Sequence, residues 1–273
     1  MFQQENQETK HITAQLKNKT PGQFIQFGTY PQAKEGKDQT PITWVVLKND
    51  GNRLLIISEK ILDCMQYHKT KEDITWEHSD IRKWLNHDFL QKAFTQEESA
   101  AIDISYLRDN GQFSCGKKIG GDFNAKYYRK RKYRYDKNGC EDTYDKIFLL
   151  NVAQARELSV KKSERVFKDD GNDRPYTYNL HRAAKGTSYA IERGLWYYKG
   201  TEDHGDFKTY PHDKYKDCVG NSEWWLRNRG SLGASCAPGV RGRGDVRDIG
   251  RDVNLGEFGV RPALHLRLPT KTK

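Results

Sequence analysis

The residues with the clearest chemistry lie near the carboxyl end, in a run from 228 to 255. These 28 residues include no Lys, Glu, Gln, Met or Trp, although those five types account for 64 of the 273 residues. Between 217 and 270 lysine is absent, while eight arginines occur. Six glycines in the run allow sharp turns, and Arg and Asp supply hydrogen-bonding forks and acceptors. The pattern favours a recognition surface for an acidic protein or glycan, and its alternative is a Gly-rich β-meander with solvated polar side chains.

We expect the ligand contacts to come from the polar side chains of this run. They are Arg229, Ser231, Arg241, Arg243, Asp245, Arg247, Asp248, Arg251, Asp252 and Asn254. The residues expected to support them are Trp224, Trp225, Arg227, Gly259, Arg261 and Pro262. If 223–227 is a strand, Trp224 and Trp225 point to opposite faces, so that one is expected in the core and the other near the site.

A second candidate is the segment 126–137, which holds seven basic residues and four tyrosines in twelve positions. The bases of a single-stranded nucleic acid could stack on the tyrosines, and the basic side chains would neutralise its phosphates. The basic residues concerned are Lys126, Arg129, Lys130, Arg131, Lys132 and Arg134. The alternative, which we favour, is a solvated basic insertion or edge strand, because no known nucleic-acid-binding motif accompanies the cluster.

The sequence offers little to catalysis or metal binding. The five cysteines are scattered without a CxxC, and their odd number favours reduced thiols: Cys64, Cys115, Cys140, Cys218 and Cys236. No Gly-rich phosphate loop, HExxH or GxSxG occurs. The pairs His204/Asp206 and His212/Asp213 are short-range pairs of a kind common in surface loops. We therefore expect no enzyme, no cofactor and no metal.

Composition predicts the kind of core and the domain organisation that support these residues. Hydrophobic residues make up 35% of the chain and charged residues 31%, with a net charge of +10, so a small aromatic core is expected. No apolar run could span a bilayer or serve as a signal peptide, which predicts a cytoplasmic protein. We expect a flexible arm at 1–21, one domain at 22–268 with a basic insertion at about 110–145, and a tail at 269–273.

The elements that must position the site form an α+β pattern. Strands are expected at 24–30, 42–47 and 53–58, with a tight hairpin turn between the last two. Ser79 begins a helix with one buried face, and Thr95 with Glu98 has the spacing of a capping box. Further elements are a strand at 147–150, a helix at 152–158, a helical turn capped by Thr187, a long loop at 196–218, and strands at 223–227 and 259–266.

Several blocks of sequence, taken in order, resemble a bacterial domain family of unknown function. These blocks are FGTYPQ, PITWVVL, LLIIS, TWEHSDIRKWLNHDFLQKAF, KIFLL, TSYA, SEWWLRNRG and FGVRPALHL, and they cover nearly all of residues 22–268. The family is similar to the C-type-lectin-like superfold, which also contains formylglycine-generating-type enzymes and the variable proteins of diversity-generating retroelements. The resemblance implies a twisted antiparallel sheet flanked by helices, with long loops, whose last strands and loops form a non-catalytic binding face.

The same resemblance raises two narrower hypotheses. In the retroelement proteins a diversified stretch ends before a GxRPA-like terminus, and residues 258–263 read FGVRPA here. Adenine-directed diversification of an AAC-type codon never yields Lys, Glu, Gln, Met or Trp, so residues 228–255 could be a variable, displayed region. Formylglycine-generating relatives use paired cysteines, which would be Cys218 and Cys236 here, but the RGGSW-type block of that family is missing.

Overall fold

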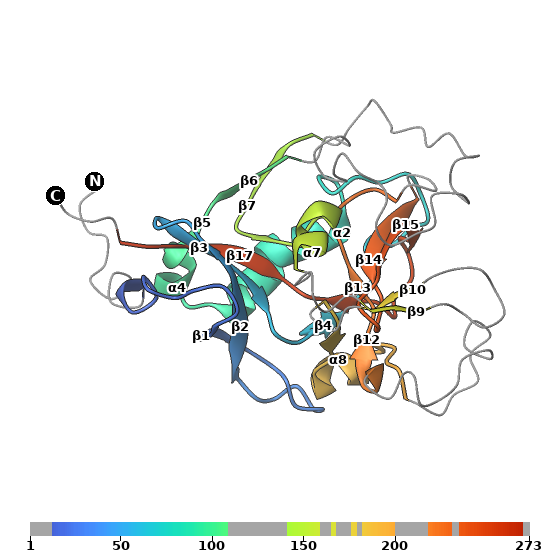
Figure 1. Ribbon diagram of the computed structural model, residues 1–273, viewed down its shortest axis with the longest axis horizontal. Helices are drawn as coiled ribbons and strands as arrows, with labels where there is room; N and C mark the ends of the chain where they lie inside the picture. The colour runs from blue at the N-terminus through green and yellow to red at the C-terminus, as the bar shows by residue number, and fades with distance from the viewer. Residues whose placement is uncertain are drawn as a thin grey trace.

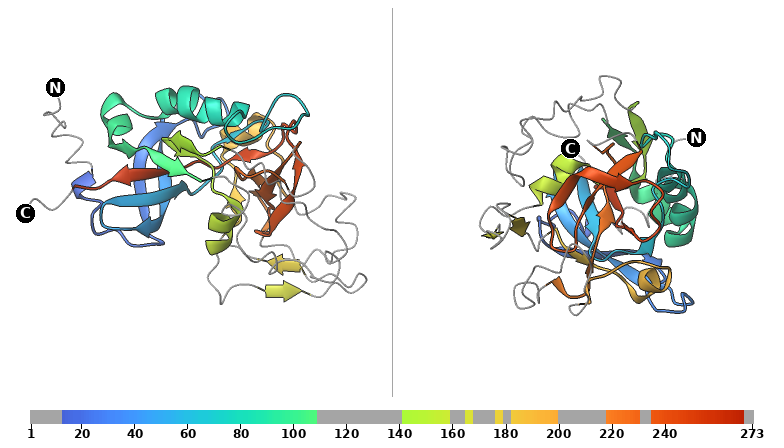
Figure 2. Two further views of the ribbon diagram at one scale, coloured as in Figure 1. Left: turned by 90° about the horizontal axis from the view of Figure 1, so that it is seen from above. Right: turned by 90° about the vertical axis from the view of Figure 1, so that its right-hand side faces the viewer.

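The chain forms a mixed α+β structure in which two sheets lie along its long axis (Figure 1). The computed structural model describes residues 13–108, 141–158, 165–167, 176–178, 182–199, 218–230 and 235–269. Figure 2 shows helices along one side of the first sheet and the second sheet beyond its end. Both sheets consist mainly of antiparallel pairs.

The first sheet follows the alternation of apolar residues in the sequence. In spatial order it contains β1 (Phe24–Tyr30), β2 (Thr40–Asn49), β3 (Arg53–Ser58), β17 (Ala263–Arg267) and β5 (Ile102–Asp103), and β8 (Ile147–Phe148) also pairs with β17. The predicted hairpin is confirmed. Its turn is closed by the carboxylate of Asp50, which accepts hydrogen bonds from the backbone N–H groups of Asn52 and Arg53. Gly51 provides the positive φ that this turn requires.

The helices begin where the sequence places their caps. They are α2 (Asp80–Trp84), which continues through a π-helical turn (Leu85–Phe89) into α3 (Leu90–Ala93), then α4 (Gln96–Ala101), α7 (Val152–Glu157) and α8 (Ser188–Glu192). Ser79 and Thr187 each accept a hydrogen bond from a backbone N–H in the first turn. Thr95 and Glu98 form the predicted capping box. These helix predictions are confirmed.

The second sheet carries the carboxyl-terminal hairpin. Its spatial order is β15 (Val246–Asp252), β14 (Cys236–Val240), β13 (Trp224–Trp225), β16 (Gly259–Val260) and β4 (Asp63–Cys64). β13 and β16 are parallel, with Trp224 opposite Gly259. Three two-stranded ribbons complete the architecture: β6 (Ser105–Leu107) with β7 (Thr143–Asp145), β9 (Arg165–Phe167) with β10 (Tyr176–Tyr178), and β11 (Ala184–Lys185) with β12 (Asn221–Ser222).

The predicted strand at 259–266 is in fact two strands that belong to different sheets. Pro262 has no N–H for a ladder, and its carbonyl instead accepts from the backbone N–H of Ser58. The buried guanidinium of Arg261 donates to the carbonyls of Ser58 and Arg182. These two residues therefore form the crossover between the sheets.

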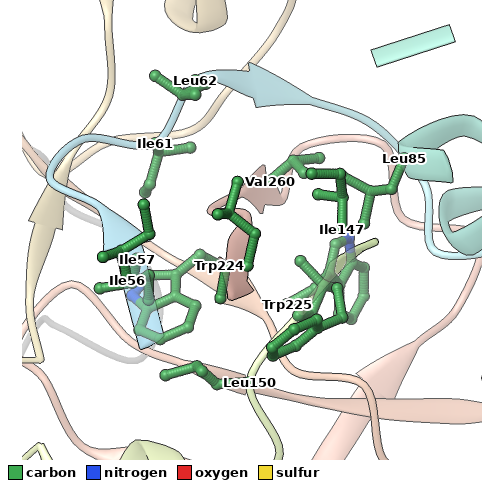
Figure 3. Packing of buried hydrophobic residues seen from close by; sticks show 14 of the residues in the cluster. Ile56, Ile57, Ile61, Leu62, Leu85, Ile147, Leu150, Trp224, Trp225 and Val260 are labelled. Carbon is green, nitrogen blue, oxygen red and sulfur yellow. The ribbon is translucent and has the colours of Figure 1, made fainter. Parts of the chain in front are cut away.

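The core continues from one sheet into the other. Trp224 and Trp225 are both fully buried. Figure 3 shows the indole of Trp224 on the side of Ile56, and that of Trp225 on the side of Ile147, with Val260 between them. The prediction that the two tryptophans point to opposite sides is confirmed. Both tryptophans belong to the core at the junction between the sheets, and the expectation that one of them lies near the site stays a prediction.

Several of the predicted domain boundaries can be compared with the described residues. Residues 13–19 pack on the first sheet: Thr13 is buried, and the side chain of Asn49 donates to the carbonyls of Lys17 and Lys19. This part of the predicted arm therefore packs against the domain, and residues 1–12 lie outside the described residues. Most of the predicted insertion (109–140) and the end of the tail (270–273) also lie outside them. No helix within the described ranges combines the length and apolarity needed to cross a bilayer.

Candidate functional site

Within the segment 228–255, residues 236–252 form a β-hairpin, in which β14 and β15 pair with a bulge near Gly239. The hairpin contributes Val240, Val246 and Val253 to the core. Asn228 is buried and its side chain accepts from the backbone N–H of Val152, which fixes the start of α7. Residues 231–234, which include the predicted contact Ser231, lie outside the described residues. The segment is thus partly scaffold, and its polar side chains must be judged one by one.

The turn of the hairpin contains an internal ion pair. Arg243 donates to both carboxylate oxygens of Asp245, at 2.7 and 3.3 Å, and Arg241 donates to the same group at 3.3 Å. Burial alone would raise the pKa of Asp245, but Arg243 and Arg241 hold it below its usual value. Arg182 donates to the carbonyl of Gly244 and ties the turn to the core. Arg243 and Asp245 were predicted as ligand contacts, and the structure instead buries both in a bidentate pair.

Beside this pair, three arginines surround one carboxyl group. Arg241, Arg247, Arg251 and Glu223, which we call the arginine cluster, interact electrostatically across β13, β14 and β15. The Nε of Arg251 lies 3.9 Å from a Glu223 oxygen, and this Nε is buried and donates no hydrogen bond. Arg247 donates to the carbonyl of Gly250 and forms no ion pair with any described carboxylate. Asp245 also acts electrostatically on Arg247, so the four arginines at positions 241, 243, 247 and 251 share two carboxyl groups, those of Glu223 and Asp245.

The pKa values of Arg247 and Glu223 reflect the burial and the crowding of positive charge in the cluster. Burial, together with the nearby charges of Arg241 and Arg251, lowers the pKa of Arg247 to about 10. Burial raises the pKa of Glu223, although the surrounding guanidinium groups pull it the other way. The surroundings therefore disfavour the charged form of Arg247 and also that of Glu223.

The remaining predicted contacts have partners of their own. Asp248 pairs with Arg156 of α7 at 3.1 Å. Asp252 pairs with Lys71 at 2.7 Å and accepts from the thiol of Cys236. Asn254 and Arg229 are half-buried, and the backbone carbonyl of Asn254 accepts from the side chain of Gln66. Of the ten predicted contacts, the structure brings together Arg241, Arg247 and Arg251 as a cluster.

A pocket opens at the Arg241 end of the hairpin. It is lined by Trp196, Tyr198, Cys218 and Glu223 together with residues 241–243, and we call it the aromatic pocket. Its wall is mostly apolar, and the empty space, open mouth included, is about 340 Å³. Glu223 and Arg241 belong to both the pocket and the arginine cluster. The two features therefore form one continuous site.

The predicted supporting residues are all buried. Arg227 donates to the carbonyl of Leu149 and to Gln154, while Arg261 lies 5.0 Å over the ring of Trp224. Gly259 has no room for a side chain, because a Cβ there would lie 2.4 Å from Ile61. These residues hold the junction on which the hairpin rests.

The cysteine pair suggested by the resemblance is not brought together. Cys218 lines the aromatic pocket beside residues 241–243, whereas Cys236 begins β14 at the opposite end of that strand. Four residues of strand separate Cys236 from Val240, or about 13 Å at 3.3 Å per residue. Within the described part of the chain, Cys64, Cys218 and Cys236 form no disulfide.

Two other predictions fall partly or wholly outside the described residues. The basic segment 126–137 lies outside them, as do His204, Asp206, His212 and Asp213. Within the described ranges, no group of three or more His, Cys, Asp or Glu side chains could hold a metal ion.

Sequence reasoning missed Glu223 and the aromatic wall of the pocket. The depletion of glutamate defined the segment of interest, so a glutamate five residues before it received no attention. Trp196 and Tyr198 were assigned to a long loop at 196–218, of which residues 200–217 lie outside the described residues. No local signal could have joined these two rings to Arg241, which lies 45 positions after Trp196 and 43 after Tyr198.

Comparison with known proteins identifies a family without assigning an activity. The chain belongs to the family described as Domain of unknown function (DUF6273), whose model matches residues 51–268. No curated protein and no solved structure matches the chain.

Proposed function

We propose that this member of the DUF6273 family is a non-catalytic, C-type-lectin-like binding module that recognises an acidic, carboxylate-bearing ligand through its arginine cluster. The observation that carries the proposal is the positive charge left unbalanced around Arg247. An arginine fork matches a carboxylate in two parallel hydrogen bonds, so a carboxylate is the chemistry this cluster would select.

The contrast with neighbouring charges supports a binding role. Other charged groups of the hairpin are paired, such as Arg243 with Asp245 and Arg156 with Asp248. Burying a charge without a partner costs free energy, and a group held in this way is a candidate for function. A purely structural cluster would gain stability by exchanging Arg247 for a neutral residue. We infer that Arg247 is kept for an external partner.

The cluster is also within reach of solvent. The side chain of Arg251 is 36% exposed and that of Glu223 is 16% exposed. The buried Nε of Arg251 has no acceptor, so it can turn toward an incoming oxygen after a small movement. A ligand carboxylate at this position would replace the distant contact with Glu223.

The display hypothesis is restricted by the same geometry. If residues 228–255 belong to a diversified region, variation is tolerable only at half-exposed positions such as Arg247 and Arg251, because Val240, Val246 and Asn228 are buried. The hypothesis predicts a template repeat and a reverse-transcriptase gene next to the coding sequence. Their absence from the genome would end it.

The binding proposal is tested with two carboxylate polymers, poly-L-glutamate and hyaluronan, and with neutral dextran as the control. Because the protein carries a net charge of +10, any polyanion could be attracted without specificity. We therefore compare Arg247→Ser/Arg251→Ser with Arg53→Ser/Arg267→Ser, which removes the same charge from exposed positions on the first sheet. We expect about tenfold or greater loss of affinity in the first variant and less than about threefold in the second.

Equal losses in the two variants would reduce the interaction to general charge attraction and overturn the proposal. The thermal stability of Arg247→Ser/Arg251→Ser gives an independent check. We expect it to match or exceed that of the wild type, since the substitution removes repulsion between half-buried guanidinium groups.

Two further measurements test the nucleic-acid hypothesis and the enzyme hypothesis. Binding of a single-stranded oligonucleotide that falls steeply with salt, and disappears when 126–137 is neutralised, would favour the nucleic-acid hypothesis. Loss of an oxidase activity in Cys218→Ser would favour the enzyme hypothesis.

A further inference from the structure

We propose that Glu223 regulates the proposed binding site: its carboxylate occupies the position of the ligand among the arginines, and its protonation admits the carboxylate of the ligand. This inference rests on the proposed function and adds a regulation to the same site. Binding of the ligand is then coupled to the uptake of a proton, so the protein binds more tightly in mildly acidic solution than at neutral pH.

The second sheet sets Glu223 directly across from an arginine. Trp224 is opposite Val240 in the antiparallel β13–β14 ladder. The residue before the tryptophan is therefore opposite the residue after the valine, which pairs Glu223 with Arg241. Neighbouring residues of a strand point to opposite faces. Because the core holds the first pair, the second pair lies on the other face of the sheet.

The same face carries the other two arginines of the cluster. Arg247 and Arg251 of β15 are opposite Gly239 and Ala237 of β14. Residues opposite one another in a ladder share a face, and positions 237, 239 and 241 alternate along the chain. Glycine and alanine leave room above β14 for longer side chains. The Nε of Arg251 accordingly comes within 3.9 Å of a Glu223 oxygen, although β14 lies between β13 and β15.

The carboxyl group of Glu223 lies among these arginines without being bound tightly. Its side chain is 16% exposed, and within the described part of the chain the carboxyl group accepts no hydrogen bond. The nearby carboxylate of Asp245, by contrast, accepts three hydrogen bonds from Arg243 and Arg241. The surrounding positive charge alone therefore holds Glu223. An incoming carboxylate that accepts hydrogen bonds from the arginine forks competes with it for the same charge.

A proton resolves this competition between two carboxyl groups. Burial already raises the pKa of Glu223, against the effect of Arg241 and Arg251. A second carboxylate raises it further, because two like charges in one enclosed space are not both retained. The aromatic pocket beside Glu223 has room for a water molecule, about 20 Å³ once its open mouth is left out. Such a water provides a route for the proton.

The charged groups that face Glu223 keep their charge between pH 5 and 7. Burial and the neighbouring guanidinium groups lower the pKa of Arg247 only to about 10. Burial opposes the ionisation of Asp245, but the adjacent arginines keep its pKa below the usual value. In the pocket wall, burial raises the pKa of Tyr198. The thiol of Cys218 is present in all the proteins compared below.

The test compares hyaluronan binding by the wild type and by Glu223→Gln at pH 7 and pH 5. The carboxyl groups of hyaluronan are stronger acids than those of poly-L-glutamate and stay charged in this range. Glu223→Gln removes the charge and keeps the size of the side chain. We expect it to bind at least about fivefold more tightly than the wild type at pH 7, with a smaller difference at pH 5. The same pH dependence in both proteins, or no gain at pH 7, would overturn the inference.

Glu35→Gln is the matched control for net charge. It removes the same charge from a side chain that is 74% exposed and paired with Lys37. We expect less than about a twofold gain in affinity from this substitution, because exposed charges are screened by salt. Equal gains in the two variants would reduce the effect to general attraction and contradict a special role of Glu223.

Calorimetry tests the inference on the wild type without a substitution. The heat of hyaluronan binding at pH 6, measured in buffers of different ionisation enthalpy, gives the number of protons taken up. We expect uptake by the wild type that is lost in Glu223→Gln, and wild-type binding without uptake would overturn the inference. If hyaluronan binding does not depend on Arg247 and Arg251, the proposed function itself fails. Binding that depends on these arginines but not on Glu223 contradicts only the regulation.

Discussion

The two sheets share a crossover through Arg261 and Pro262, but they treat charge differently. In the first sheet the buried positions of β2 and β3 are apolar except for Ser58, and Ile42, Trp44 and Ile56 are almost completely enclosed. The second sheet encloses Arg243 and Asp245 beside its valines, and its Arg247 forms no direct ion pair with a carboxylate of the described residues. Hydrophobic burial stabilises the first sheet, whereas the second sheet keeps charged side chains at positions where apolar residues would be more stabilising. This difference is the basis of the recognition role that we propose for the second sheet.

The largest expected difference in stability between the two sheets comes from a substitution at Asp245. Asp245→Asn would leave Arg241 and Arg243 facing a neutral amide in a buried turn, and we expect a loss of about 3–5 kcal/mol in the free energy of unfolding. Asp252→Asn is the control on the same strand pair, since the ion pair with Lys71 is exposed and should contribute less than about 1 kcal/mol. Urea unfolding measures both. Similar losses would mean that the turn is not held by its charges.

The next largest expected effect is a loss of folding stability at low pH, which occurs in a different pH range for each sheet. In the first sheet His265 accepts or donates a hydrogen bond at Ser105, and burial with the nearby Arg53 lowers its pKa from about 6.5 to about 4. The unfolded chain therefore binds a proton between these pH values while the folded chain does not, so stability falls as the pH decreases from about 6.5 to 4, by about 3 kcal/mol in total.

Asp245 acts in a different pH range. Its folded pKa is lowered, so the stability it contributes is complete above its unfolded value of about 3.9 and is lost only below that value. Urea titrations at pH 7, 4 and 2 separate the two ranges. His265→Gln should remove most of the loss between pH 7 and 4 and little of the loss below pH 4. A variant with an unchanged pH profile would show that His265 is not the group responsible.

The smallest expected effect concerns the junction between the sheets. Gly259→Ala places a methyl group 2.4 Å from a side-chain carbon of Ile61, and overpacking of this kind costs about 1–3 kcal/mol. Gly256→Ala is the matched control, because its added methyl would make only an ordinary contact of 3.7 Å with Gln66. Thermal melts of the two variants compare them directly. Equal melting temperatures would mean that the junction can relax around the added methyl.

The amino-acid sequence by itself determined the elements whose signals are local. The hairpin closed by Asp50 and Gly51, the cap at Ser79 and the capping box of Thr95 with Glu98 depend on residues within a few positions of one another. Composition also drew attention to the hairpin that carries the site. In each case the hydrogen bonds or turn conformations are fixed by neighbours in the chain, so the pattern predicts them without the fold.

Only the tertiary structure decided which of the conspicuous arginines are available. Arg243 and Arg247 are four positions apart in the same Gly-rich run, yet one is enclosed with Asp245 and the other lacks a described carboxylate partner. Likewise, Glu223 and Trp196 reach Arg241 from other segments of the chain. Pairing, burial and pKa depend on atoms that the fold brings within a few ångströms, and spacing in the sequence does not encode those distances.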